Sequence, residues 1–147
     1  MEHWTRREPL EAVHAVGGAI IQAHPFRLRH YNDRIRLGDL FADGVEVANA
    51  GNEQPECARA LRYAKAKGLL MTAGSDNHHS PTDMLFGVEL EKKLTSIYDY
   101  VSIIRNREPI GLHVPEERFI LPKEEPDEKH RAWHLEANEE IVPVDGF

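Results

Sequence analysis

The chain has 147 residues, a length typical of one domain, and its 25 acidic and 18 basic side chains give a net charge of −7. This negative net charge argues against a protein that binds nucleic-acid backbones over a broad surface. No apolar run approaches the roughly 20 residues that a membrane span needs, and no N-terminal signal-peptide pattern is present. The single cysteine, Cys57, cannot form an intramolecular disulfide. We therefore expect a cytoplasmic protein with no nucleic-acid surface and no membrane partner.

Helix and strand signals alternate along residues 1–115. Helices are predicted over 8–16, 53–67 and 95–106, and short apolar strands over 19–23, 44–49, 69–73, 86–90 and 110–114. Pro9 and Gly17 bound the first helix, and Asn52 is the predicted N-cap of the second, which ends at Gly68. Strands separated by helices of this length favour parallel pairing with right-handed crossovers. The predicted fold class is therefore α/β.

Charge distinguishes the C-terminal part of the chain. Residues 116–147 carry most of the net negative charge, contain several prolines and show weak periodicity, whereas residues 1–115 are nearly neutral. The sequence therefore predicts an α/β domain over 1–115 and an acidic C-terminal extension over 116–147 that is mostly irregular and solvated. A strand at 118–121 and a turn or short helix at 128–134 are the local structures that the pattern of the extension allows.

Polar side chains gather where three of the predicted strands end. His24 follows the first strand, Glu46 lies in the second, and Asp76 and His78 follow the third. In parallel α/β folds the carboxyl ends of the strands meet at one edge, and sites form there. Imidazole nitrogen and carboxylate oxygen are preferred ligands of divalent metals. The placement of these residues therefore predicts a metal site at this edge.

Local geometry favours the same site, although each signal is modest alone. Asp76 and His78 are two positions apart, which places both side chains on one side of an extended segment. Pro25 biases His24 toward extended backbone and so helps to fix its direction. An isolated Asp-x-His pair in a loop is usually an ordinary solvated pair. Glu46 is open between a metal ligand, a support for a ligand and a structural ion pair.

Three motifs in combination are more specific. Residues 23–25 (Ala-His-Pro), 44–49 (Gly-Val-Glu-Val-Ala-Asn) and 74–78 (Gly-Ser-Asp-Asn-His) resemble, in this order, the later motifs of the PHP (polymerase and histidinol phosphatase) family. Residues 22–27 are especially similar to its bacterial phosphoesterase members, and the resemblance covers about residues 8–112. It implies a distorted, TIM-like (βα) barrel of seven strands with a cluster of two or three divalent ions (Zn, Mn, Fe or Mg).

The resemblance also implies a chemistry and a set of site residues. His24, Asp76 and His78 match metal ligands of the family, and Glu46 matches a recurring acid. Family members hydrolyse phosphate esters, including histidinol phosphate and nucleotide substrates. The implied mechanism is attack by a metal-activated water, with Asp76 and His78 in catalytic positions. Arg27 and Arg29, just beyond His24, are candidates for gripping the substrate phosphate in bidentate fashion.

One departure from the family pattern concerns the N-terminal part. The family opens with a His-x-His strand motif and further ligands, whereas the 23 residues before His24 contain only the isolated His3 and His14. The chain therefore resembles the C-terminal half of the domain, and we expect a partial barrel that lacks its N-terminal strands. A missing N-terminal segment, another chain or a homo-oligomer would complete it.

Several functions are compatible with these patterns. The first is a metal-dependent phosphoesterase that hydrolyses a small phosphomonoester or nucleotide. The alternative is a non-catalytic metal-binding or assembly module derived from such a barrel. A metallo-hydrolase of the amidohydrolase type is weaker, because the Gly-Ser-Asp-x-His motif favours the phosphoesterase. Arg34 and Arg36 are as compatible with a solvated loop face as with phosphate recognition.

Overall fold

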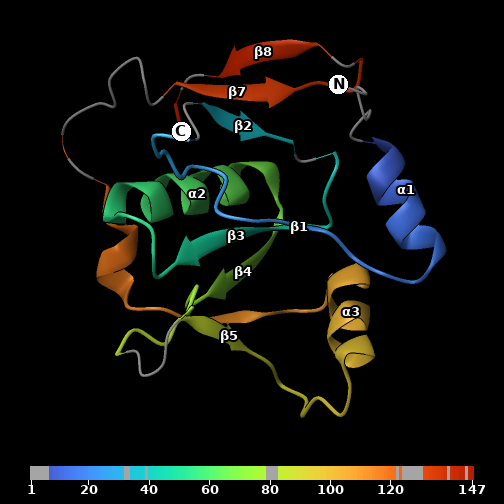
Figure 1. The fold of residues 1–147 in the computed structure, drawn as a ribbon. Coiled ribbons are helices and arrows are strands. Elements are labelled where there is room, and N and C mark those ends of the chain that lie inside the picture. Colours follow the sequence, from blue (N-terminus) through green and yellow to red (C-terminus); the bar gives the residue numbers. More distant parts are fainter. Residues whose placement is uncertain are drawn as a thin grey trace.

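The structure, a computed structural model, describes residues 7–31, 34–38, 40–78, 83–121, 123, 131–138, 140–144 and 146–147. Within these residues the fold is a small mixed α/β arrangement (Figure 1). Its helices are α1 (Arg7–Ala15), α2 (Gln54–Lys67), α3 (Ile97–Arg105) and the short 3-10 helix η1 (Glu116–Phe119). Its strands are β1 (Ile21–Gln22), β2 (Ile35–Leu37), β3 (Gly44–Asn49), β4 (Leu70–Gly74), β5 (Gly87–Glu89), β6 (Gly111–His113), β7 (Ala132–Leu135) and β8 (Ile141–Val144). They form three sheets, ordered β1-β3-β4, β2-β7-β8 and β5-β6.

The parallel sheet β1-β3-β4 carries the strand ends that the sequence singles out. Its middle strand, β3, pairs with β1 through Ile21 opposite Gly44, and with β4 through Glu46 opposite Thr72. Five of the six β3 residues are buried, which fits a strand covered on both faces. Gly44 permits this packing, because a Cβ there would lie 2.8 Å from the carbonyl oxygen of Leu70.

Helix α2 connects β3 to β4 and lies between the central sheet and β2 (Figure 1). It begins after Glu53, whose amide donates a 2.8 Å hydrogen bond to the Glu56 carboxylate. It ends at Gly68, which adopts the left-handed conformation with φ 61°. Asn52, the predicted cap, instead uses its side-chain oxygen to accept a hydrogen bond from Arg27. The predicted helix is confirmed, with its N-cap one residue later.

The sheet β2-β7-β8 joins the middle of the chain to its C-terminal part. β2 pairs in parallel with β7, which pairs antiparallel with β8. Ala132 and His134 of β7 are buried, and the ring of Phe147 packs edge-on against Tyr63 with centroids 5.4 Å apart. Instead of the irregular, solvated extension expected over 116–147, its described part thus contains two strands and core contacts. The physical reason is that three of the four β7 residues are buried between β2 and β8, while acidic residues follow the strand.

One core cluster lies between this sheet, α2 and the central sheet. Its buried members come from the loop after β1, from β2, β3, α2 and β7, namely Phe26, Ile35, Leu37, Val45, Val47, Ala60, Tyr63, Ala64 and Ala132. The strand β2 was not among the predicted elements, because its two apolar residues alternate with arginines. Its burial depends on contacts with residues far away in the sequence.

The remaining strands differ from the predicted arrangement. β5 and β6 are connected through α3 but pair antiparallel, with Val88 opposite Leu112, so the expected parallel pairing is wrong here. The predicted strand at 118–121 is also wrong, since η1 occupies its first two residues and the other two belong to no strand. Residues 128–130 lie outside the described part of the chain, and the rest of the predicted turn or helix at 128–134 belongs largely to β7.

The expected partial (βα) barrel of PHP type is wrong for the described residues. A barrel requires neighbouring strands to form one continuous, staggered hydrogen-bonded sheet. Here the central ladder contains β1, β3 and β4, while β5 pairs with β6 and β2 pairs with β7. The chain is a mixed α/β fold of three small sheets.

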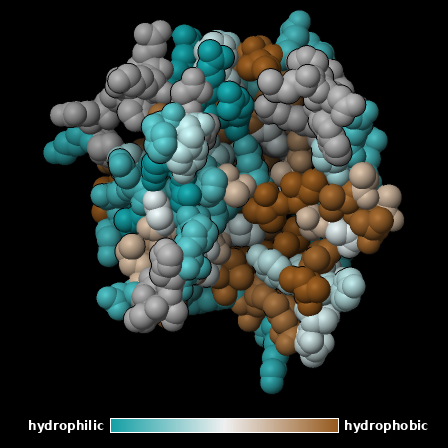
Figure 2. Space-filling view, viewed as in Figure 1, coloured by the Kyte–Doolittle hydropathy of each residue, from teal (hydrophilic) through white to brown (hydrophobic). Residues whose placement is uncertain are grey.

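An apolar surface lies on the side of the molecule where α1 and α3 are found (compare Figures 1 and 2). Val16, directly after α1, is 84% exposed, and Ile97 at the start of α3 is 67% exposed. The homo-oligomer expected from the sequence remains a prediction. In the described part of the chain, no helix combines the length and apolar character required to cross a membrane.

Candidate functional site

Three of the predicted site residues meet at one end of the central sheet. β1 leads to His24, β4 leads to Asp76, and β3 between them carries Glu46. Because all three strands run in parallel, their carboxyl ends point in the same direction. The topology therefore collects residues that are up to 52 positions apart in the sequence, from His24 to Asp76.

Glu46 holds the loop that carries His24. Its Oε2 accepts a hydrogen bond of 2.8 Å from the His24 backbone amide, and its Oε1 accepts one of 3.1 Å from the Asn49 side-chain amide. A Cβ at Gly74 would lie 3.1 Å from the same Oε1, so the glycine leaves room for the carboxylate. Of the roles left open for Glu46, these contacts support positioning of the His24 loop.

Arg27 ties this loop to Asp76. Its Nη2 donates to Asp76 Oδ2 at 2.9 Å and to the side-chain oxygen of Asn49, while its Nε donates to Asn52 Oδ1 at 2.6 Å. The Arg27 side chain is 11% exposed and that of Asp76 is 25% exposed. The guanidinium therefore lies inside a polar network that orients one oxygen of Asp76.

The network requires a glycine at position 51. A Cβ there would lie 3.0 Å from Asp76 Oδ2, 3.1 Å from Arg27 Nη2 and 3.2 Å from Asn49 Oδ1. We expect Gly51→Ala to lower the free energy of unfolding by about 1 kcal/mol, because overpacking forces these polar atoms apart. Urea denaturation measures the effect. Gly87→Ala is the matched control, since no heavy atom lies within 4 Å of its added Cβ; equal effects of the two substitutions would contradict the prediction.

Asp76 is flanked by imidazoles as well as by Arg27. His78 Nε2 lies 3.7 Å from Asp76 Oδ1, on a side chain that is 76% exposed. The hydrogen bond and the charge of Arg27 hold the pKa of Asp76 below its ordinary value, and nearby His78 and His24 contribute in the same direction. Asp76 is therefore kept ionised, with Oδ2 bound to Arg27 and Oδ1 facing His78.

The backbone is unusual at both loop residues. His24 has φ 29° and Asp76 has φ 51°, a region that residues with a Cβ rarely adopt. The extended geometry predicted for His24 from Pro25 is thus wrong, and the bond from its amide to Glu46 explains how the conformation is held. Such strained residues cluster at binding and catalytic sites, where the surrounding structure over-determines them.

The Asp76 carboxylate and the His78 imidazole suit a divalent cation as ligands. Two ligands of one tetrahedral zinc ion lie about 3.4 Å apart, given bonds of about 2.1 Å, and the Asp76–His78 separation of 3.7 Å is near this value. A carboxylate oxygen and an imidazole nitrogen also suit manganese and iron. Among the residues that the structure describes, no three His, Cys, Asp or Glu side chains form a group that could hold a metal ion. His79 lies outside the described residues.

The two arginines predicted to bind substrate are engaged in internal ion pairs. Besides the Arg27–Asp76 pair, Arg29 Nη1 lies 2.8 Å from Glu56 Oε1, and its Nη2 donates to the Gly51 carbonyl oxygen at 2.9 Å. Glu56 raises the pKa of Arg29 through this hydrogen bond. Both guanidiniums therefore shape the site, and a substrate phosphate would have to share them with these carboxylates.

Sequence reasoning missed two supporting residues, Gly51 and Asn52. They lie in the turn between β3 and α2, where Asn52 accepts a hydrogen bond from Arg27 and Gly51 leaves space for it. The available signal was the segment Asn-Ala-Gly-Asn (49–52), which begins at the last residue of a buried strand. Reading Asn52 as a cap concealed its part in the site.

Comparisons with known proteins give a partial likeness. No protein-family model matches the chain, and neither does a solved structure. A 5′-3′ exoribonuclease of Haemophilus influenzae (strain ATCC 51907 / DSM 11121 / KW20 / Rd) is 35% identical over 74 residues. The match covers 47% of the chain and 27% of the exoribonuclease, so it spans about a quarter of that relative. The chain is thus similar, over about half of its length, to a segment of a longer enzyme.

Proposed function

We propose that the chain carries part of the site of a metal-dependent hydrolase that cleaves phosphate esters of RNA with a metal-activated water. The supporting observation is the Asp76–His78 pair, with His24 on the loop after the parallel strand β1, at the carboxyl ends of the central strands. Phosphoester hydrolysis is also the chemistry that the PHP-like motifs imply. The proposal concerns these motifs and does not extend to a barrel.

The choice of RNA rests on the partial likeness to the 5′-3′ exoribonuclease. RNA is a chain of phosphodiesters, and its hydrolysis requires the same in-line attack by water on phosphorus that a phosphomonoester requires. An enzyme that works from a strand end needs a local site for the terminal nucleotides, and it does not need a broad basic surface. The net charge of −7 is therefore compatible with an RNA substrate.

The residues of the site have separate parts in this mechanism. Asp76 Oδ1 and His78 would hold the divalent ion, with His24 beside them. When bound, such an ion supplies a nucleophilic water near neutral pH and neutralises charge on the phosphoryl oxygens. Arg27 orients Asp76 and keeps it ionised, and Glu46 holds the His24 loop in place.

A non-catalytic metal-binding or assembly module is the second candidate. It is favoured by the ion pairs of the two arginines expected to bind substrate, because Arg27 is held by Asp76 and Arg29 by Glu56. In this case the chain would bind a divalent ion without turning over RNA by itself.

One experiment separates these candidates. The purified chain is analysed for bound metal by mass spectrometry, and then assayed with Mn²⁺, Zn²⁺ or Mg²⁺ on a 5′-phosphorylated RNA oligonucleotide and on p-nitrophenyl phosphate. RNA cleavage that EDTA abolishes supports the hydrolase. Bound metal without cleavage supports the module, and hydrolysis of p-nitrophenyl phosphate alone supports a small phosphomonoester as substrate. Neither binding nor turnover would contradict both candidates.

A further inference from the structure

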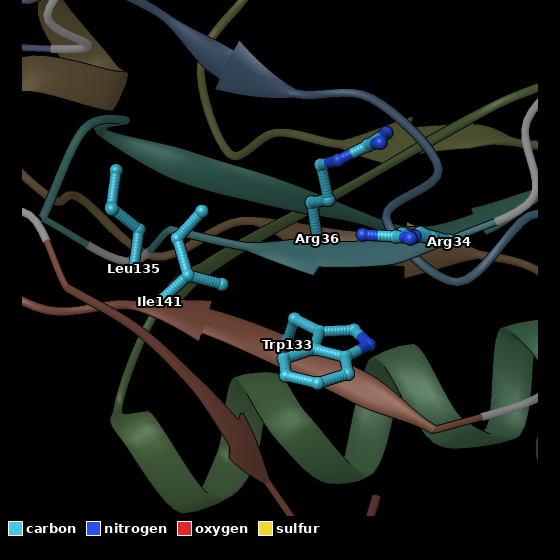
Figure 3. Close-up of a pocket in the computed structure, with 5 residues that line it drawn as sticks. All are labelled: Arg34, Arg36, Trp133, Leu135 and Ile141. Carbon is cyan, nitrogen blue, oxygen red and sulfur yellow. The ribbon is translucent and has the colours of Figure 1, made fainter. Parts of the chain in front are cut away.

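A pocket lies on the sheet β2-β7-β8, and none of its lining residues belongs to the candidate site. It has a volume of about 240 Å³ and is lined by Arg34, Arg36, Trp133, Leu135 and Ile141. Figure 3 shows these side chains around one opening, with Arg36 from β2, Trp133 from β7 and Ile141 from β8. Two guanidiniums, an indole ring and two aliphatic side chains therefore share one small hollow.

Strand alternation explains why these side chains share one face. Arg36 is exposed between the buried Ile35 and Leu37, so it points away from the core. The register places Arg36 opposite Trp133, which in turn lies opposite Pro143 on β8. Positions two residues away from these point to the same side. The pocket is thus built into the regular outer face of the sheet, on strands whose inner face belongs to the core.

Positive charge gathers at one end of this face. Arg34 directly precedes β2 and Arg131 directly precedes β7, and the parallel register of Ile35 opposite Ala132 brings both to the same end of the sheet. The Arg131 guanidinium carbon lies 5.8 Å from the centre of the Trp133 ring. The other end of the pocket is apolar. An occupant would therefore need a flat apolar part and an anionic part side by side.

A nucleotide has this combination of groups. Bases of single strands stack on aromatic side chains, and arginine binds phosphate oxygens in bidentate fashion. We propose that the pocket binds one nucleotide unit of single-stranded RNA, with the base on Trp133 and the phosphate at Arg34 and Arg36. RNA as the source of this unit rests on the proposed function, whereas the pocket's preference for a stacked base and an anion rests on its own residues.

A second hollow adjoins this pocket at Arg36. It has a volume of about 400 Å³ and is lined by Pro9, Ile20, Gln22, Arg36, Gly38, Phe41 and Ala42. Arg36 lines both hollows, and the Gln22 side chain donates a 2.6 Å hydrogen bond to the Arg36 carbonyl oxygen. Ile20 lies directly before β1 and Ala42 shortly before β3, so this hollow lies toward the amino ends of the central strands. A strand held at Trp133 can thus continue past Arg36 into this hollow.

Binding of a fluorescein-labelled oligoadenylate of five nucleotides tests the proposal, measured by anisotropy in EDTA so that no turnover occurs. Trp133→Leu is expected to raise the Kd between about five- and 100-fold, while Trp133→Phe, which keeps a stacking ring, retains most of the affinity. Arg34→Gln combined with Arg36→Gln is expected to make the slope of log K against log salt less steep by about 1.4. Circular dichroism and urea denaturation establish that each variant is folded.

Controls separate this site from the hydrolytic one. Arg62→Gln removes an exposed arginine of α2 and is expected to leave the Kd unchanged. Asp83→Ala, which removes an exposed carboxylate outside the pocket, is also expected to bind the oligonucleotide like the wild type. Adenosine monophosphate is expected to compete at least tenfold more weakly than the oligonucleotide. It fills the pocket at Trp133 alone, whereas the oligonucleotide also reaches the adjoining hollow.

The outcomes bear on the two proposals separately. Trp133-dependent binding without any RNA cleavage would support the pocket and contradict the hydrolase. Cleavage by a folded Trp133→Leu variant whose Kd is unchanged would support the hydrolase and overturn the pocket. Equal affinity for adenosine monophosphate and the oligonucleotide would overturn RNA as its ligand.

Discussion

Asp76→Ala is expected to lower the rate of RNA hydrolysis by a factor on the order of 10³. The substitution removes the carboxylate that faces His78 and accepts the Arg27 hydrogen bond, and the several kcal/mol that a divalent ion supplies would be lost with it. Initial rates with saturating Mn²⁺ measure the effect. Metal content by mass spectrometry is expected to fall in parallel, because one of the proposed ligands is missing.

The matched control is Asp83→Ala, which removes an exposed carboxylate in the segment that follows β4. It is expected to retain wild-type turnover and metal content. Asp76→Asn keeps the shape of the side chain and one oxygen for Arg27 while removing the charge, so it is expected to fold normally and to be nearly as inactive as the alanine variant. An active, folded Asp76→Ala protein would remove the basis for metal chemistry at this sheet edge.

Glu56→Ala is expected to lower the free energy of unfolding by about 2 kcal/mol, a large effect for one polar side chain. Glu56 accepts hydrogen bonds from the amides of Leu28 and Glu53 and forms the ion pair with Arg29. Its removal leaves a partly buried guanidinium and two amides without this acceptor. Equilibrium urea denaturation measures the change, and the m-value shows whether unfolding remains two-state.

Two further variants sharpen this test. Glu56→Gln retains one oxygen acceptor and is expected to show an intermediate loss, whereas Glu91→Ala on the exposed surface is expected to change stability by less than about 0.5 kcal/mol. A Glu56→Ala protein as stable as the wild type would show that other contacts hold the 27–29 loop against α2.

Local sequence signals were sufficient for the helices and for the central strands. The predicted strand at 44–49 is β3 itself, and the glycine stop at Gly68 ends α2 in the left-handed conformation. Both features depend on neighbouring residues: a continuous buried apolar run, and a residue that tolerates positive φ. By contrast, the two apolar residues of β2 are separated by Arg36, and their burial depends on β7, which lies nearly 100 positions away.

In the candidate site, too, some features follow from the local sequence and others depend on contacts between distant residues. The position of His24, Asp76 and His78 after two strands of one parallel sheet can be predicted from the sequence, because parallel strands present their carboxyl ends together. The parts played by Arg27 and Arg29 are not visible there. A guanidinium after a histidine loop suits a phosphate as well as a carboxylate, and only the folded chain shows that Asp76 and Glu56 lie within reach.

The sequence by itself determined the α/β alternation, the bounds of β3 and α2, and the identity of the residues at the strand ends, since each depends on local periodicity and caps. Tertiary structure alone decided that the strands form three separate sheets, that β7 pairs with β2, and that the arginines after His24 bind carboxylates. These outcomes depend on pairing energies between distant segments. Such pairing energies cannot be read from the hydrophobic periodicity of one segment, because a strand taken alone could pair with several other strands.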